Sequence, residues 1–424
     1  MTQTSLANTS RISLTLEELE EIYVGTSLEG KCHILFDTPK DSEDFIKNFF
    51  SSRLWRLNNC YNIINKQGEL IIMAMNRAQH IVYAEFLRHP RLLILKSRQQ
   101  GISTFWLVFF FDTLLFYPNK KAGLMSQGLD ESAELLDKLS ILWNNMDPDI
   151  LEELQVTKTK DNSKTFELSN NSKMLVRTSF RSGTLQMLHI SEMGKIANAY
   201  PARAREVKTG SLQALAPGLP GIIESTAEGV NEFKYMWDTA VAFIGEMSYK
   251  DFKAVFLPWL DDPDCTTDIQ QEQTKEGKDY FTSLEKEYGL VATEQQKWFW
   301  ESQFRELGLD IFQEYPATPE EAFRAALEGA YYGSYVARYI TRGENRIREG
   351  LYNAALPITI SMDLGLNDDF VLFFWQFYAG EHRLVREYYS NDELTSHYVD
   401  IIKHYYQEAN ICLLYTSPSP RDRG

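Results

Sequence analysis

Short apolar runs alternate with longer helix-like segments between about residues 91 and 227. Four of these runs have the length and composition of strands buried on both faces, namely 92–96, 122–126, 185–191 and 221–226. The segments 102–116 and 130–146 are long enough to predict helices. Strands that alternate with helices are typical of an α/β fold with a largely parallel sheet.

Two local patterns lie on either side of the first helices. Residues 13–23 begin with Thr15 and Glu18 at the spacing of a capping box, which predicts a short helix. Apolar residues in 166–168 and 174–178 flank a pair of asparagines like the two strands of a hairpin.

The sequence changes character at about residue 260, where charged, helix-forming sequence begins and runs through 282–307 to Gly308. A further α/β pattern predicts three strands and one helix, at 358–363, 370–378, 382–389 and 393–408. The chain therefore divides into an N-terminal arm, an α/β domain, a linker subdomain, a third unit and a tail, at 1–50, 51–259, 260–355, 356–411 and 412–424.

Composition narrows the class of protein. The 424 residues suggest two or three domains, and 44% hydrophobic with 24% charged residues is typical of globular proteins. A net charge of −16 argues against a chain-wide basic surface for nucleic acid, although a local basic channel is compatible with it. The four cysteines include no Cys-x-x-Cys pair, so we expect neither a zinc site nor disulfides. This cysteine usage predicts a protein of a reducing cytoplasm.

No membrane segment or signal peptide is expected. The N-terminus lacks a basic start and an apolar middle. The longest apolar stretch, 105–117, is interrupted by Asp112 and is shorter than the ~20 residues that span a bilayer, so we interpret it as a buried helix.

The tail has an unusual sequence, Cys412-Leu-Leu-Tyr-Thr-Ser-Pro-Ser-Pro-Arg-Asp422. It resembles a translated sequencing-library adapter rather than the end of a folded domain. We therefore expect the natural sequence to stop near Ile411, with the third unit truncated there.

A strand, a polar loop with one glycine and a helix follow one another early in the α/β domain. In that arrangement, backbone N–H groups and a helix N-terminus bind phosphate oxygens. The loop departs from the G-x-x-x-x-G-K-[ST] pattern. When Gly101 and Ser103 are aligned with its second Gly and its Ser/Thr, Ile102 replaces the lysine. The phosphate-facing cation must then be Lys96 or Arg98, and the Ser103 hydroxyl is expected to hold Mg²⁺.

Three further segments carry side chains suited to ATP chemistry. About ninety residues after the loop, an apolar strand ends in Glu192, a carboxylate that can polarise an attacking water. Ser191 stands where Asp is usual, and its hydroxyl is expected at most to hydrogen-bond a metal-bound water. A later strand ends in Ser225 and Thr226, which can respond to loss of the γ-phosphate. Upstream of the loop, the Gln79 amide can pair with the adenine edge.

Taken in order, seven motifs resemble those of the large terminase subunit of tailed bacteriophages, the ATP-driven motor and nuclease that packages DNA into proheads. They are Ser52-Arg-Leu-Trp-Arg-Leu57, Met75-Asn-Arg-Ala-Gln79, Leu95-Lys-Ser-Arg-Gln-Gln-Gly-Ile-Ser-Thr104, Leu188-His-Ile-Ser-Glu192, Glu224-Ser-Thr-Ala-Glu-Gly229, Glu314-Tyr-Pro-Ala-Thr-Pro-Glu-Glu-Ala-Phe323 and Ser361-Met-Asp-Leu-Gly365. They lie within about residues 50–380.

The resemblance implies that 51–259 is a P-loop (RecA-like) ATPase domain. It implies that Gln79 reads adenine and that the phosphates are bound by the loop residues Lys96, Ser97, Arg98, Gln99, Gln100, Gly101, Ile102, Ser103 and Thr104. It also implies that Glu192 is the catalytic glutamate, that Arg98 acts as a cis arginine against the γ-phosphate, and that Ser225-Thr226 is the coupling motif.

The third unit then resembles the start of an RNase H-like nuclease domain. Asp363 ends its first predicted strand, and Asp368 or Asp369 follows at the hairpin. The resemblance implies that Asp363 and Asp368 hold Mg²⁺ or Mn²⁺ for two-metal phosphodiester hydrolysis. The remaining metal-binding acids are expected beyond Ile411, so the nuclease site is expected to be incomplete in this chain.

The function implied is ATP-driven translocation of double-stranded DNA into a prohead, coupled in the full-length protein to endonucleolytic cutting of concatemers. ATP and Mg²⁺ are the expected cofactors. The expected partners are double-stranded DNA, the portal protein, the small terminase subunit and further copies of the chain in a ring, in the host cytoplasm. Two alternatives stay open: a P-loop translocase or helicase without nuclease, and a catalytically idle DNA-binding relic, suggested by Ile102 and Ser191.

Overall fold

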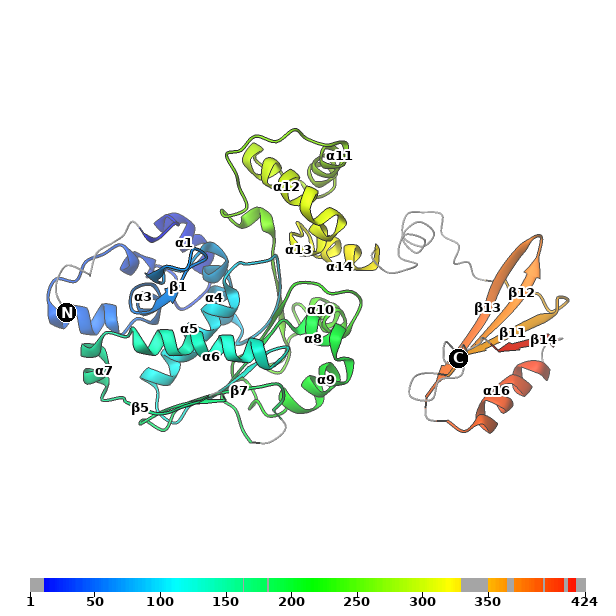
Figure 1. Cartoon of the computed structure of the whole chain (residues 1–424), viewed down its shortest axis with the longest axis horizontal. Helices are drawn as coiled ribbons and strands as arrows, with labels where there is room; N and C mark the ends of the chain where they lie inside the picture. Colours follow the sequence, from blue (N-terminus) through cyan, green and yellow to red (C-terminus); the bar gives the residue numbers. More distant parts are fainter. Residues whose placement is uncertain are drawn as a thin grey trace. The chain divides into compact units, whose positions relative to one another are not determined.

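The computed structural model describes residues 11–162, 164–180, 183–328, 350–363, 370–391, 393–407 and 411–416. The chain forms two compact units, Met1–Ser334 and Tyr335–Gly424, which are described one at a time (Figure 1). No helix in the described ranges is both long enough and apolar enough to cross a bilayer.

An eight-stranded sheet lies at the centre of the first unit. Its order is β10-β3-β9-β8-β4-β7-β6-β5, with parallel pairing from β10 to β7 and antiparallel pairing from β7 to β5. The bounds are β3 Arg91–Lys96, β4 Lys121–Met125, β5 Lys158–Asn162, β6 Thr165–Leu168, β7 Lys173–Arg177, β8 Met187–Ser191, β9 Gly221–Ser225 and β10 Lys253–Leu257. The predicted strands and hairpin are confirmed to within two residues, whereas β5 and β10 were not predicted.

Five parallel strands of this sheet have the order found in RecA-like ATPases. Taken in chain order, β3, β4, β8, β9 and β10 are the first to the fifth, and across the sheet they run 5-1-4-3-2. Because they are parallel, their carboxyl ends meet at one edge, which is where ligands bind in open α/β sheets. The predicted α/β P-loop fold is therefore confirmed.

Helices cover both faces of this sheet (Figure 1). Leu92 and Ile94 of β3 pack into a core with α5 (Ile102–Phe116) and α6 (Leu129–Asn144). Leu93 and Leu95 face the opposite core, which is formed with α8 (Met193–Ala199), α9 (Pro201–Glu206) and α10 (Glu232–Ala242). Successive strand residues point to opposite faces, so a strand between two helical layers is apolar throughout.

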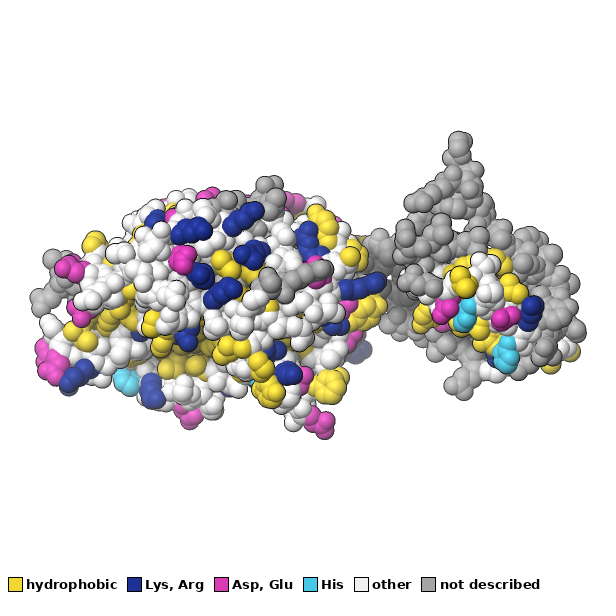
Figure 2. All heavy atoms as spheres, turned by 90° about the horizontal axis from the view of Figure 1, so that it is seen from below, with side chains coloured by type: hydrophobic (Ala, Val, Ile, Leu, Met, Phe, Trp, Pro, Cys, Tyr) yellow, Lys and Arg dark blue, Asp and Glu magenta, His cyan; other side chains and the backbone are white. Residues whose placement is uncertain are grey.

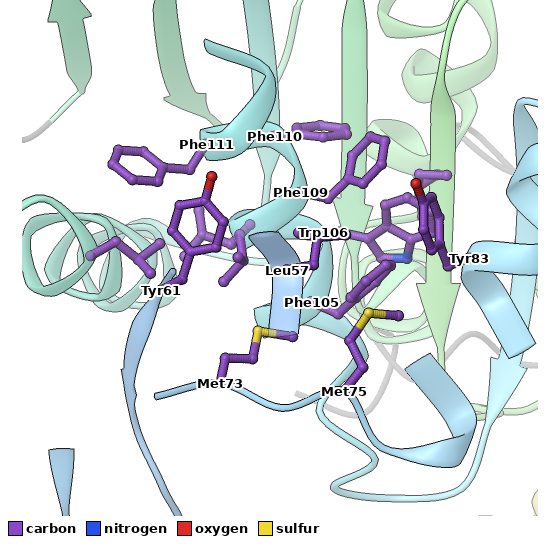
Figure 3. Packing of buried hydrophobic residues seen from close by; sticks show 14 of the residues in the cluster. Leu57, Tyr61, Met73, Met75, Tyr83, Phe105, Trp106, Phe109, Phe110 and Phe111 are labelled. Carbon is purple, nitrogen blue, oxygen red and sulfur yellow. The ribbon is translucent and has the colours of Figure 1, made fainter. Parts of the chain in front are cut away.

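Helix α5 has the predicted bounds and is buried on nearly all sides. Its aromatic residues from Phe105 to Phe111 pack against side chains of the N-terminal segments, including Tyr61, Met73 and Tyr83 (Figure 3). Those segments contain α1 Leu16–Tyr23, α2 Ser42–Asp44, α3 Arg53–Asn59, β1 Asn62–Ile64, β2 Leu70–Ile72 and α4 Arg77–Arg88. The capping box predicted between Thr15 and Glu18 is present at the start of α1.

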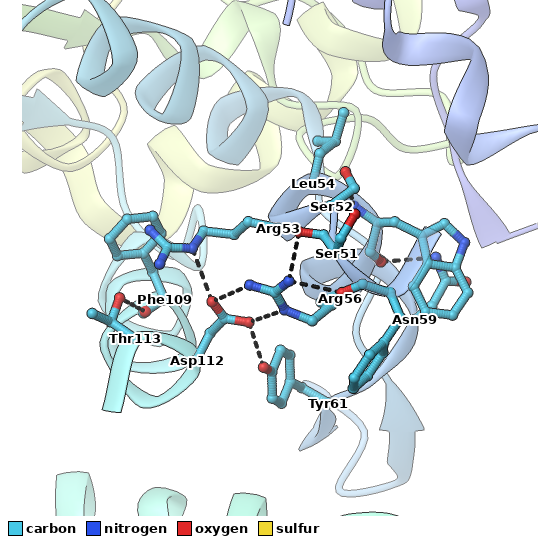
Figure 4. Close-up of polar contacts among 12 residues, drawn as sticks. Ser51, Ser52, Arg53, Leu54, Arg56, Asn59, Tyr61, Phe109, Asp112 and Thr113 are labelled. Atoms are coloured by element: carbon cyan, nitrogen blue, oxygen red, sulfur yellow. Dashed lines mark hydrogen bonds and ion pairs between the residues drawn. The ribbon is translucent and has the colours of Figure 1, made fainter. Parts of the chain in front are cut away.

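A buried ion network fastens α3 to α5 (Figure 4). Asp112 is fully buried; it accepts hydrogen bonds from Arg56 Nε at 2.7 Å and Nη2 at 3.0 Å, from Arg53 Nε at 2.9 Å and from Tyr61 Oη at 2.6 Å. Burial alone would raise the pKa of Asp112, but the two guanidinium groups and the Tyr61 hydroxyl outweigh it and lower that pKa. The carboxylate is therefore ionised, and both of its oxygens accept hydrogen bonds.

Residues 259–317 fold around a small core of their own that includes Trp259, Phe281 and Trp300, whereas Ala322 and Phe323 pack in the core with α10. The helices there are α11 Lys275–Ser283, α12 Glu294–Leu307 and α13 Ile311–Glu314, followed by α14 Pro319–Glu328; α7, Pro148–Leu154, belongs to the α/β domain. The helix-forming sequence at 282–307 is helical on both sides of an interruption and ends at Gly308. Gly289 adopts a left-handed φ of +70° and Thr293 caps a new helix, so the chain turns between the two.

In its described residues the second unit contains a four-stranded sheet of order β13-β12-β11-β14 and the helix α16. The bounds are β11 Ile358–Asp363, β12 Phe370–Tyr378, β13 Glu381–Ser390, α16 Thr395–Gln407 and β14 Ile411–Thr416. The first three strands are antiparallel as predicted, and β14 pairs in parallel with β11. Strand pairing uses backbone groups that every residue carries, so the assignment of 412–424 to an adapter stays a prediction.

We expect Asp112→Ala to lower the free energy of unfolding by about 3–5 kcal/mol, because the buried guanidinium of Arg56 would lose its counter-charge. Asp264→Ala is the matched control, since Asp264 pairs with Lys66 at 2.6 Å but both side chains are exposed and screened by solvent. Urea unfolding followed by tryptophan fluorescence measures both. Equal losses in the two variants would contradict a special role for the buried network.

Candidate functional site

The loop between β3 and α5 depends on a glycine at its end. Gly101 is the N-cap of α5 with φ +72°, and Gln99 before it has φ +61°. A Cβ on residue 101 would lie 2.8 Å from Gln79 Nε2. Ile102, at the position of the usual lysine, is buried in the core. The loop therefore presents backbone and the start of α5, without a lysine from the helix.

Hydrogen bonds to neighbouring segments hold this loop in place. Ser97 N–H donates to Leu257 O at 3.0 Å, and Gln100 Nε2 donates to Ser97 Oγ at 2.7 Å. Gln79 Nε2 donates to Gly101 O at 3.0 Å, while its Oε1 accepts from Asn76 N–H at 3.1 Å. Both ends of the Gln79 amide are thus engaged within the chain. Reading adenine, the role predicted for Gln79, would require it to give up these bonds.

Lys96 lies inside the site. Its side chain is 7% exposed, with Nζ 3.1 Å from Glu192 Oε1 and 3.2 Å from Glu224 Oε2. Burial alone would lower the pKa of Lys96, but Glu224 and Glu192 outweigh it and raise that pKa well above its usual range. Lys96 is therefore a fixed positive charge between two carboxylates.

Arg98 is placed differently. Its side chain is 53% exposed and its Nη1 lies 3.7 Å from Glu314 Oε2, a loose contact compared with those of Lys96. Its backbone N–H donates to Glu314 O at 2.9 Å, which fixes the main chain and leaves the guanidinium at the surface of the loop. The two candidate cations thus differ in accessibility, with Lys96 enclosed and Arg98 open to solvent.

Glu192 lies at the end of β8 in a strained backbone conformation. It is the N-cap of α8 with φ +56° and ψ +47°, a left-handed geometry that a non-glycine residue adopts at an energetic cost. Its side chain is 26% exposed and contacts Lys96 on one side and Lys195 Nζ, at 3.7 Å, on the other. The side chain is therefore held, partly exposed, at the edge of the sheet, with Oε1 bonded to Lys96 and Oε2 buried.

Glu224 is the site residue that sequence reasoning missed. It is fully buried, and its Oε1 accepts hydrogen bonds from Ser103 Oγ at 2.6 Å and Ser191 Oγ at 2.7 Å. His189 Nε2 lies 3.4 Å from the same oxygen. Burial would raise the pKa of Glu224, but Lys96, His189 and Ser103 outweigh it and hold that pKa well below its usual range. The one available signal was an acid within an otherwise apolar strand.

The predicted coupling residues connect β9 to the helix that follows Glu192. Ser225 Oγ accepts a hydrogen bond from Gly194 N–H at 2.9 Å. A Cβ on Gly194 would lie 2.8 Å from both Ser225 Oγ and Thr226 O, so only glycine allows this close packing. The Thr226 hydroxyl is buried and has no hydrogen-bond partner within the described part of the chain. A shift at the end of β9 would thus displace Gly194, which lies two residues after Glu192.

Metal ions are considered at two places, the candidate nucleotide site and Asp363 of the second unit. Among the described residues, no group of three or more His, Cys, Asp or Glu side chains is arranged to hold a metal. Mg²⁺ bound with a nucleotide is held mainly by phosphates and waters with one or two protein groups, which the pair Ser103 and Glu224 fits. In the second unit, Asp363 is exposed at the end of β11. Asp368 lies outside the described residues.

No family model matches the sequence, and no curated protein matches it either. Three solved structures are similar in chain trace. The large terminase of a thermophilic bacteriophage is 10% identical with a TM-score of 0.36, covering 82% of this chain and 79% of that one. The large terminase of bacteriophage HK97 is 12% identical with a TM-score of 0.44, over 87% and 74%. The ATPase domain of the Thermus phage P74-26 large terminase is 14% identical with a TM-score of 0.32, over 54% and 88%.

These three are large terminase subunits. They belong to the family that the sequence motifs resemble, and the first of them was also solved with ATP-γ-S and with ADP.

Proposed function

We propose that the first unit binds and hydrolyses ATP. The observation that carries this proposal is the convergence of Lys96, Ser103 and Glu192 at the carboxyl edge of a RecA-like sheet, beside the loop at the start of α5. A fixed cation, a hydroxyl and a carboxylate are the groups that phosphoryl transfer to water requires. The strained backbone of Glu192 adds support, because such strain clusters at functional positions.

The roles follow from accessibility. Glu192, partly exposed at the edge of the sheet, orients and deprotonates the attacking water. Lys96 supplies enclosed positive charge for the phosphates, and Arg98 is free to turn from Glu314 toward the γ-phosphate. Mg²⁺ bound with ATP would neutralise charge that develops on the phosphates. Ser225, bonded to Gly194, transmits movement of β9 to the α8 segment that carries Glu192.

We further propose that ATP hydrolysis drives double-stranded DNA into a prohead, in the host cytoplasm, with the portal protein and small terminase subunit as partners and a homo-oligomeric ring as the working form. A local basic surface supports the DNA contact despite the net charge of −16. Figure 2 shows Lys and Arg side chains gathered on the face that carries β5 to β7.

Strands β5 and β7 and the turn after β5 carry five cations, Lys158, Lys160, Lys164, Lys173 and Arg177. Lys158 pairs with Asp161 at 2.8 Å and Lys173 with Glu167 at 3.4 Å. The other three are exposed and make no ion pair within the described part of the chain. They are therefore the available contacts for DNA phosphates.

For the second unit we propose a metal-dependent nuclease role in the full-length protein. Three antiparallel strands followed by a helix agree with the start of an RNase H-like fold. Asp363, at the end of the central strand β11, would hold Mg²⁺ or Mn²⁺ there. A translocase or helicase without nuclease gives no reason for this unit, and an idle relic gives none for the strained Glu192.

We expect Glu192→Gln to lower ATP turnover by about 100-fold or more while nucleotide binding is retained, because the amide cannot accept the water's proton. Steady-state phosphate release and binding of a fluorescent ATP analogue measure the two properties. Glu167→Gln, a half-buried carboxylate on the outer strand β6, should behave like the wild type. Equal turnover in all three proteins would remove Glu192 from its assigned role.

We expect replacing Lys160, Lys164 and Arg177 together by Gln to weaken binding to duplex DNA and to flatten its dependence on salt. Each lost phosphate contact should reduce the slope of log affinity against log salt by about 0.9. The matched control replaces the exposed Lys275, Lys278 and Lys286 in the same way, and its slope should not change. The same slope for both triple variants would show that DNA lies elsewhere.

We expect this chain not to nick supercoiled plasmid in Mn²⁺, because among the described residues Asp363 belongs to no group of three or more His, Cys, Asp or Glu side chains arranged to hold a metal. Nicking by the wild type that Asp363→Asn abolishes would contradict an incomplete nuclease site. Asp400→Asn is the control, since Asp400 is exposed on α16 in the same unit.

A further inference from the structure

Strand β8 carries no acid at the position before its catalytic candidate. Residue 191 is a serine, which we expected at most to hydrogen-bond a metal-bound water. In the structure the Ser191 hydroxyl instead donates to a carboxylate on the neighbouring strand, Glu224 Oε1, at 2.7 Å. The carboxylate missing from β8 is therefore present one strand away.

Sheet register explains why this carboxylate reaches the same place. Strands β8 and β9 are parallel, and Ser191 pairs directly with Glu224. Adjacent strands lie ~4.8 Å apart and paired residues point to the same face. That face is the one covered by α5, which begins beside Ser103. A carboxylate at 224 thus lies beside the position that a carboxylate at 191 would have.

The direction of the hydrogen bonds matters for a metal. An ionised carboxylate only accepts, so the Ser103 hydroxyl points its proton at Glu224, with the oxygens 2.6 Å apart. The lone pairs of Ser103 Oγ point away from that bond, and its other hydroxyl contact is a long one, to Ser191 Oγ at 3.4 Å. A hydroxyl that binds Mg²⁺ needs its lone pairs for the metal and an acceptor for its proton, and Glu224 is that acceptor.

We propose that Glu224 is the positioning residue for nucleotide-bound Mg²⁺, acting through Ser103 and taking from β9 the role that an acid at position 191 would have on β8. This inference rests on the proposed ATPase function. The competing role is purely electrostatic: Glu224 would serve only as the counter-charge of Lys96, whose Nζ lies 3.2 Å from its Oε2.

The two roles differ in how they respond to Mg²⁺. If Glu224 positions the metal through Ser103, removing its charge weakens nucleotide binding only when Mg²⁺ is present. If it serves only as the counter-charge of Lys96, removing its charge changes the affinity by the same factor with Mg²⁺ and with EDTA, because Lys96 acts on the phosphates in both conditions.

The experiment measures binding of a fluorescent ATP analogue in Mg²⁺ and in EDTA, and of Mn²⁺ to the ATP-saturated protein by electron paramagnetic resonance. We expect Glu224→Gln to lose about tenfold or more of the strengthening that Mg²⁺ gives to the wild type, and to bind Mn²⁺ correspondingly more weakly. Glu167→Gln should keep both properties. Glu192→Gln, which removes the other partner of Lys96, should keep the Mg²⁺ dependence.

A rescue variant separates positioning from a folding defect. In Glu224→Ser combined with Ser191→Asp the carboxylate returns to β8, and Mg²⁺-dependent binding should recover, whereas Glu224→Ser alone should lack it. Ser103→Ala should lose the same Mg²⁺ dependence. Unchanged Mg²⁺ dependence in Glu224→Gln, or an equal change in Mg²⁺ and EDTA, overturns the inference alone. A wild type that binds no nucleotide in either condition overturns the proposed function itself.

Discussion

The buried carboxylate of Glu224 is the constraint around which the candidate site is arranged. A fully buried ionised group is tolerated only when donors compensate for the water it has lost. Its partners come from three other elements: Ser103 of α5 and Ser191 of β8 donate hydrogen bonds, and Lys96 of β3 and His189 of β8 lie within ion-pair distance. Satisfying one carboxylate thus fixes the phosphate loop, the helix that follows it and the catalytic strand relative to one another.

Helix α5 is also held in place at its other end, far from the phosphate loop. Asp112 lies near its other end and is bound by two arginines and a tyrosine of the N-terminal segments. The aromatic residues between Ser103 and Asp112 are buried in the same core. Because the helix is enclosed on nearly all sides, it cannot turn without breaking packing at both ends. The N-terminal segments therefore support the site, although they contribute no catalytic group to it.

Two of the strained backbone positions lie where the chemistry is expected. Gln99 and Glu192 both have left-handed φ values, and Gly194 allows a contact that a Cβ would prevent. Natural proteins depart from local preferences mainly at functional positions, where the surrounding structure compensates for the cost. At Glu192 that compensation includes Lys96 and Lys195, which hold the carboxylate from two sides.

The sequence alone determined the α/β class, the bounds of α5, most of the parallel strands and the order of the chemical motifs, because apolar periodicity and capping are short-range properties. It did not reveal the partly buried edge strand β10, nor the break in 282–307 where a glycine and a new cap interrupt helix-forming sequence. Only the tertiary structure decided which polar groups meet. Ser103 and Glu224 are 121 residues apart but share a hydrogen bond, and the packing of α4 against the loop engages the amide of Gln79. Such contacts depend on long-range strand order and register, which no local pattern in the sequence encodes.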